Sequence, residues 1–123
     1  MAKSKINLNE ITFGGVNQKE LTNFTRQFAT LQNAGLNTLR SLEILMNMLK
    51  PGVLKKAIRN IRDEVEQGTP LSDSMSHYPK AFDSLYVNMV RAGEAGGVLD
   101  GILVRLADFR EKSQKIAGEI KAA

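Results

Sequence analysis

The sequence predicts an all-α protein, an antiparallel bundle of six helices, five of them substantial and one short. Apolar residues recur at intervals of three or four, which places them on one face of a helix. No run of four or more residues alternates between apolar and polar in the way that a half-buried strand does. Glycine and proline residues divide the apolar runs into segments joined by short corners.

The length and composition fit one globular domain. The chain has 123 residues, of which 42% are hydrophobic and 24% charged. It has no cysteine, which excludes disulfides, thiolate metal sites and a cysteine nucleophile. The net charge of +4 is too small to identify a nucleic-acid partner by itself. No apolar run approaches the roughly 18 residues that a transmembrane helix needs.

The N-terminal half predicts an arm and a helical hairpin. We expect residues 1–16 to form a flexible arm, because their lysines, asparagines and glycine pair leave little to bury. Asn17 is a good N-cap for the first helix, and Gly35 is suited to end it. A second helix is expected from Asn37 to Lys50, where Pro51-Gly52 interrupts the pattern. The short connection predicts that these two helices pack antiparallel.

Two further helices are expected in the middle of the chain. The first runs from about Val53 to Gln67 and stops at a glycine. Thr69 then offers an N-cap oxygen, and Pro70 suits the first helical position. The helix that begins there is short, from Leu71 to about His77, because Pro79 forbids its continuation.

A glycine-rich corner separates the last two helices. Asp83 is the expected N-cap of the fifth helix. Gly93, Gly96 and Gly97 fall within five residues and predict a tight turn, after which the sixth and longest helix begins near Gly97. The residues expected to be buried in these two helices are Leu85, Tyr86, Met89, Val90, Leu99, Ile102, Leu103, Leu106 and Phe109.

Six short blocks carry a resemblance to a known family. They are Phe24-Thr25-Arg26-Gln27 with Leu31, Ala34-Gly35-Leu36 and Leu42; Val65 through Gly68; Leu71-Ser72; Tyr78-Pro79 with Phe82; Met89-Val90 with Ala92-Gly93-Glu94 and Gly96; and Leu99 with Leu106-Ala107. Between about Gln18 and Glu111, in this order and spacing, they resemble the F domain of the platform proteins of type II secretion and type IV pilus machines. Asn37 stands where the family often has proline.

The resemblance implies a scaffold and not an enzyme. It implies that residues 17–123 form a helical F domain at the cytoplasmic face of the bacterial inner membrane. The implied partners are the assembly ATPase, other inner-membrane assembly proteins, pilins or pseudopilins, and further copies of the chain, as a homodimer or higher oligomer. Family members continue into transmembrane helices and a second related domain. We therefore expect this chain to be the first cytoplasmic domain of a longer protein.

Glu94 in the glycine corner is the candidate site residue with two opposed interpretations. It either caps a helix or is solvated, which is the commoner outcome for such an acid, or it recognises a partner. We expect a mixed role, in which the carboxylate ties the fifth helix to the sixth or to another copy of the domain. Together with Asp100 and corner carbonyl groups it offers hard oxygen ligands for Ca²⁺, although no EF-hand spacing supports a calcium site. Arg26 and Gln27 flank the first apolar stripe, where Arg26 is expected to lie along it with its charge in water.

Lys55, Arg59 and Arg62 share one face of the third helix and form a possible interaction surface. A solvated face is the simpler interpretation, but cations near a helix N-terminus oppose the helix dipole. The alternative function is therefore a basic helical module that binds nucleic acid or anionic lipid. Nucleic acid is the less favoured ligand, because no aromatic residues interleave with the cations. No catalytic motif, metal cluster or cofactor motif is recognisable, so no cofactor is expected.

Overall fold

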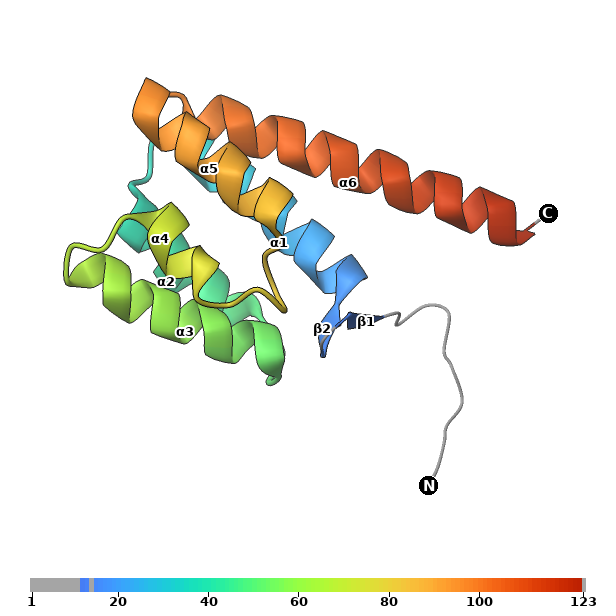
Figure 1. The fold of residues 1–123 in the computed structure, drawn as a ribbon, viewed down its shortest axis with the longest axis horizontal. Coiled ribbons are helices and arrows are strands. Elements are labelled where there is room, and N and C mark those ends of the chain that lie inside the picture. Colours follow the sequence, from blue (N-terminus) through green and yellow to red (C-terminus); the bar gives the residue numbers. More distant parts are fainter. Residues whose placement is uncertain (1–11, 14, 123) are drawn as a thin grey trace.

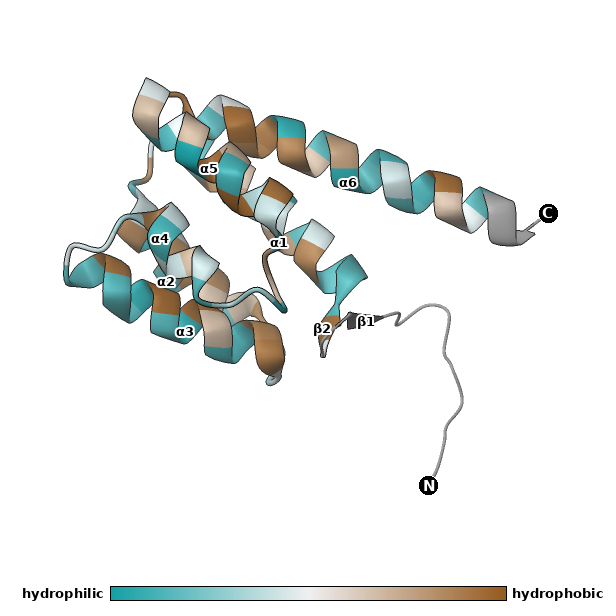
Figure 2. Ribbon diagram, in the orientation of Figure 1, coloured by the Kyte–Doolittle hydropathy of each residue, from teal (hydrophilic) through white to brown (hydrophobic). Residues whose placement is uncertain are grey.

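The computed structural model describes residues 12–13 and 15–122, and it is an all-α bundle as the periodicity predicts. Its six helices are α1 (Gln18–Asn33), α2 (Thr38–Met48), α3 (Val53–Glu66), α4 (Leu71–Ser76), α5 (Ser84–Gly96) and α6 (Leu99–Ala122). Five of them are substantial and α4 is short, in agreement with the prediction. The helices are amphipathic, with hydrophobic and hydrophilic residues in alternating bands along each ribbon (Figure 2).

The helices form two groups that share one core (Figure 1). Helix α1 packs along α6, and α5 packs against α6 and α4. Helices α2 and α3 form the neighbouring hairpin, and α4 lies between α3 and α5. The C-terminal half of α6 extends beyond the other helices (Figure 1). Only Gln114 is partly buried among residues 111–119.

Aromatic rings fill the centre of the core. The ring of Phe24 lies 5.7 Å from that of Phe28 and 6.3 Å from that of Phe82, measured between centroids. Phe82 in turn lies 5.0 Å from Tyr86 in an edge-to-face arrangement. All four side chains are buried, so α1 and the start of α5 are joined by close aromatic packing.

Two predicted N-caps, Asn17 and Asp83, are confirmed, and Asn37 is a third that the sequence analysis did not identify as a cap. Asn17 accepts a hydrogen bond from the backbone N–H of Glu20 at 3.0 Å. Asn37 caps α2 in the same way, although the family often has proline there. Asp83 accepts from the backbone N–H of Tyr86 at 2.9 Å and begins α5. Each cap satisfies one of the backbone donors that a helix leaves unpaired at its start.

The end of α1 also agrees with the prediction. Gly35 adopts a φ of +92°, a conformation that glycine reaches without the steric penalty of a Cβ atom. The N–H of Leu36 then donates to the carbonyl of Leu31 at 3.2 Å, which closes the last turn.

Part of the expected N-terminal arm has regular structure, which corrects the prediction for residues 12, 13 and 16. Strands β1 (Thr12–Phe13) and β2 (Val16–Asn17) form a small antiparallel hairpin. Val16 is only 1% exposed and belongs to the hydrophobic core. The composition of the segment did not predict this burial, because it depends on contact with α3, far along the sequence, as well as with the adjacent α1. The first 11 residues lie outside the described part of the chain.

Three local expectations are wrong. The N-cap position of α4 is Pro70 and not Thr69. Leu85 and Phe109 are 51% and 57% exposed, although both were expected in the core. Helical spacing alone allowed a wider apolar stripe than the neighbouring helices cover. On α5 the covered stripe is centred on Tyr86 and Val90, about 100° around the helix from Leu85.

Candidate functional site

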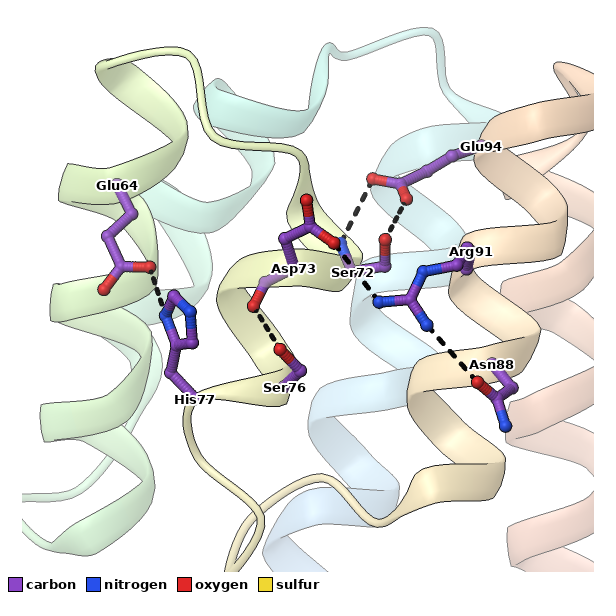
Figure 3. A network of polar contacts seen from close by, with 8 residues as sticks. All are labelled: Glu64, Ser72, Asp73, Ser76, His77, Asn88, Arg91 and Glu94. Atoms are coloured by element: carbon purple, nitrogen blue, oxygen red, sulfur yellow. Dashed lines mark hydrogen bonds and ion pairs between the residues drawn. The ribbon is translucent and has the colours of Figure 1, made fainter.

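The glycine corner and the short helix α4 form one polar arrangement, because side chains from α3 and α5 bond to α4 from its two sides (Figure 3). Ser72 and Ser74 of α4 are both buried and face glutamates on different neighbours. We call this arrangement the α4 frame and define it as Glu64, Ser72, Ser74, His77 and Glu94.

Glu94 joins the corner to the first turn of α4. Its carboxylate accepts a hydrogen bond from the backbone N–H of Ser72 at 3.2 Å and a second one from the Ser72 hydroxyl. Pro70 has no side chain that can accept from these donors. Glu94 therefore supplies from α5 the acceptor that an N-cap residue normally supplies within the chain. Its negative charge also suits the N-terminal end of a helix.

Glu64 holds the other side of α4 to α3. Its carboxylate accepts from the Ser74 hydroxyl at 2.6 Å and lies 3.0 Å from Nδ1 of His77. The hydroxyl of Tyr78 donates to it at 3.3 Å. The bond from Ser74 is the main cause that lowers the pKa of the Glu64 carboxyl, and partial burial opposes it. Glu64 and Ser74 were not predicted as site residues, and Ser72 was named only in a family block, because the partners of these serines are 10 to 22 residues away.

An exposed ion pair adds a weaker link between α4 and α5. Arg91 donates to the Asp73 carboxylate at 3.2 Å and to the Asn88 side-chain oxygen at 3.3 Å (Figure 3). Both partners of the ion pair are about half exposed. Such a pair contributes little to stability in water.

The three glycines of the corner have different structural roles. Gly97 ends α5 in the left-handed region, with a φ of +70°. Gly93 is helical, but a Cβ atom built there would lie 3.0 Å from the Cα atom of Leu99 and from a side-chain carbon of Ile102. Close approach of α6 therefore requires glycine at this position. At Gly96 a Cβ atom would make only an ordinary contact, 3.5 Å from Val98.

Arg26 has a specific partner set that the sequence did not reveal. It bonds to Asp108 at 2.5 Å and to both oxygens of Glu111 at 2.8 Å, which joins α1 to α6. These hydrogen bonds raise the pKa of Arg26 and lower that of Glu111. Gln27 is exposed, and Phe24 lies in the core.

A buried hydrogen bond joins α1 to α5 beneath the aromatic cluster. The Thr25 hydroxyl donates to the Leu21 carbonyl at 2.8 Å, so the Tyr86 hydroxyl donates to Thr25 at 2.7 Å. Burial raises the pKa of Tyr86 to about 12. Both hydroxyl groups are thereby satisfied inside the core.

Two of the three cations predicted to share a face of α3 are engaged in contacts with neighbouring residues. The Lys55 amine donates to the backbone carbonyl of Leu49 at 3.3 Å. Arg62 bonds to Asp63 at 2.8 Å and lies 3.7 Å from Glu43. Arg59 is exposed and has no ion-pair partner among the residues that the structure describes.

The oxygen ligands considered for Ca²⁺ are engaged in other contacts. Both Glu94 oxygens bond to Ser72, and Asp100 accepts from the backbone N–H of Gly101 at 2.8 Å. Within the described part of the chain, no three acidic or histidine side chains are grouped as metal ligands.

Comparison with known proteins places this geometry in a family. The family described as type II secretion system (T2SS), protein F, matches residues 24–123. The chain belongs to this family. The matched residues include Arg26 with its partners Asp108 and Glu111, the α4 frame and the glycine corner. The match confirms the resemblance that the six sequence blocks indicated.

Relatives of this F-family chain are named for two machines. It is 46% identical over 111 residues to a type IV pilus assembly protein PilC of Myxococcus xanthus, covering 90% of the chain. It is 44% identical over 100 residues, 81% of the chain, to a type II secretion system protein F of Xanthomonas campestris. A PilC protein of Thermus thermophilus is 42% identical over 109 residues, 89% of the chain.

The chain spans about a quarter of the length of these relatives, between 25% and 27%. No helix in the described part of this family member has both the length and the hydropathy that crossing a membrane requires.

Proposed function

We propose that this chain is a non-enzymatic docking domain of an assembly platform in a type IV pilus or type II secretion machine. Membership of the F family carries the proposal, because its relatives are named for these two machines. The described residues form a bundle whose polar contacts link helices to one another, as a scaffold requires. Its place would be the cytoplasmic face of the bacterial inner membrane.

The proposed partners are the assembly ATPase of the machine, other inner-membrane assembly proteins and the pilins or pseudopilins. The decisive experiment is co-purification of the tagged chain with the ATPase from the same organism. Retention of the ATPase at physiological salt would support docking. As a control, Phe28→Ala destabilises the buried core and should reduce retention in proportion to the loss of folded chain. Failure of the folded chain to retain the ATPase would contradict this partner.

We also propose that the chain self-associates. Its exposed apolar side chains support this: Leu85, Phe109 and Ile116 are 51%, 57% and 47% exposed. Phe109 and Ile116 are seven residues apart and so lie on the same side of α6. Sedimentation should show a dimer or larger species that Phe109→Ser weakens. A monomer at high protein concentration would contradict self-association of this chain.

The alternative function is binding of an anionic polymer or surface through the start of α3. Lys56 and Arg59 support it, because both are exposed and neither forms an ion pair with another described residue. Binding to duplex DNA and to anionic vesicles at two salt concentrations tests it. Tight binding that falls steeply with salt would favour this alternative over protein docking.

A further inference from the structure

A second polar feature lies near the start of α5, in a cleft lined by residues of α1, α5, α6 and the loop before α5. It has a volume of about 260 Å³, and its polar walls are Gln18, Lys80, Asp83, Tyr86 and Arg110. We call it the Arg110 cleft. None of the predicted site residues lies in it, although Pro79 of the family blocks lines its wall.

Arg110 is partly buried and has only neutral hydrogen-bond partners. Its Nε donates to the Thr22 hydroxyl at 3.2 Å, and one terminal nitrogen donates to the Gln18 side-chain oxygen at 2.7 Å. A guanidinium carries five N–H groups, so donors remain for a further ligand. Burial lowers the pKa of Arg110, and the nearby Asp83 carboxylate opposes this effect only in part.

The other charges of the cleft define the ligand that fits. No carboxylate of the described residues lies within ion-pair distance of Arg110 or Lys80. Asp83 lines the wall, but one of its oxygens caps α5. One arginine, one lysine and one aspartate give the cleft a net charge of +1. A single negative charge complements it.

We propose that the Arg110 cleft binds the side-chain carboxylate of an acidic residue on a partner protein. The guanidinium presents paired N–H donors that match a carboxylate. The volume is below the roughly 300–1,000 Å³ of sites for small organic ligands, but it accommodates one acidic side chain. A partly desolvated cation in such a cleft bonds more strongly than an exposed one. Binding of a carboxylate is inferred from the cleft itself, and only its assignment to a partner protein rests on the proposed docking function.

The test is a nuclear magnetic resonance titration of the ¹⁵N-labelled 123-residue chain. The probe is the tripeptide acetyl-Gly-Glu-Gly-amide, and its Gln counterpart is the matched control ligand. We expect saturable shifts confined to Gln18, Lys80 and Arg110 with the Glu peptide alone. Arg110→Gln should weaken binding at least about tenfold, whereas Arg105→Gln, an exposed change on the same helix, should not alter it.

Several outcomes would overturn the proposal. Equal shifts with the Gln peptide, or unchanged binding by Arg110→Gln, would show that the carboxylate is not recognised. Shifts with phosphatidylglycerol vesicles but not with the Glu peptide would assign the cleft to a lipid headgroup. If Arg110→Gln does not fold, Lys80→Gln in the exposed loop replaces it and should weaken binding several-fold. Because the titration needs no other component of the machine, it can fail while co-purification with the ATPase succeeds, and the converse also holds.

Discussion

Replacement of Glu94 by glutamine tests whether the glycine corner holds α4 in place. The Glu94 carboxylate accepts two hydrogen bonds from Ser72, one from the backbone and one from the hydroxyl. Glutamine keeps one acceptor oxygen, loses the charge at the start of α4, and turns an NH₂ group towards a donor. Hydrogen bonds to charged groups are worth about 1.5–3 kcal/mol each. We expect Glu94→Gln to lower the free energy of unfolding by about 1–3 kcal/mol.

The assay is urea unfolding followed by circular dichroism at neutral pH. Ser72→Ala removes only the hydroxyl donor, so the double variant should show a coupling energy of about 0.5–2 kcal/mol. Glu66→Gln is the matched control, because Glu66 is exposed at the end of α3, and it should change stability by less than about 0.5 kcal/mol. Unchanged stability of Glu94→Gln, or additive effects of the two substitutions, would refute a structural role for this carboxylate. Loss of partner binding with stability unchanged would instead support recognition.

Three further predictions follow from the geometry of the core and the α4 frame. Gly93→Ala should destabilise the chain by about 1–3 kcal/mol, because its Cβ atom would press against the start of α6, whereas Gly96→Ala should be tolerated. Urea unfolding of both variants checks this, and equal losses of stability would contradict a specific role of Gly93 in packing. Phe28→Ala should cost about 3–5 kcal/mol and Met89→Ala distinctly less, since Phe28 is fully buried and Met89 only partly; similar losses in melting experiments would contradict this burial pattern. The pKa of Glu64 is lower in the folded protein, so its stabilising contribution is present above the unfolded pKa and is lost as the pH falls through the folded one. Glu64→Gln should therefore lose less stability than the unchanged chain when the pH is lowered. Measurements of the free energy of unfolding at several acidic pH values test this, and an equal loss in both proteins would argue against it.

The sequence by itself determined the helices, several of their ends and the family. Periodicity of three to four residues is a local property, and so are the caps at Asn17 and Asp83 and the glycine at position 35. These signals act within a few residues of one another, which is why five substantial helices and one short helix could be predicted. The ordered sequence blocks were likewise sufficient to indicate the family that the comparison confirmed.

The tertiary structure alone decided which faces are covered and which polar groups meet. Leu85 has the same apolar character as its buried neighbours, but no adjacent helix covers it. Glu94 was recognised as a candidate, yet its partner Ser72 is 22 residues away, and Arg26 meets Glu111 across 85 residues. Contacts at such separations depend on how the helices cross. A one-dimensional pattern specifies the face that each helix can bury, whereas the packing of the whole bundle selects the atoms that touch.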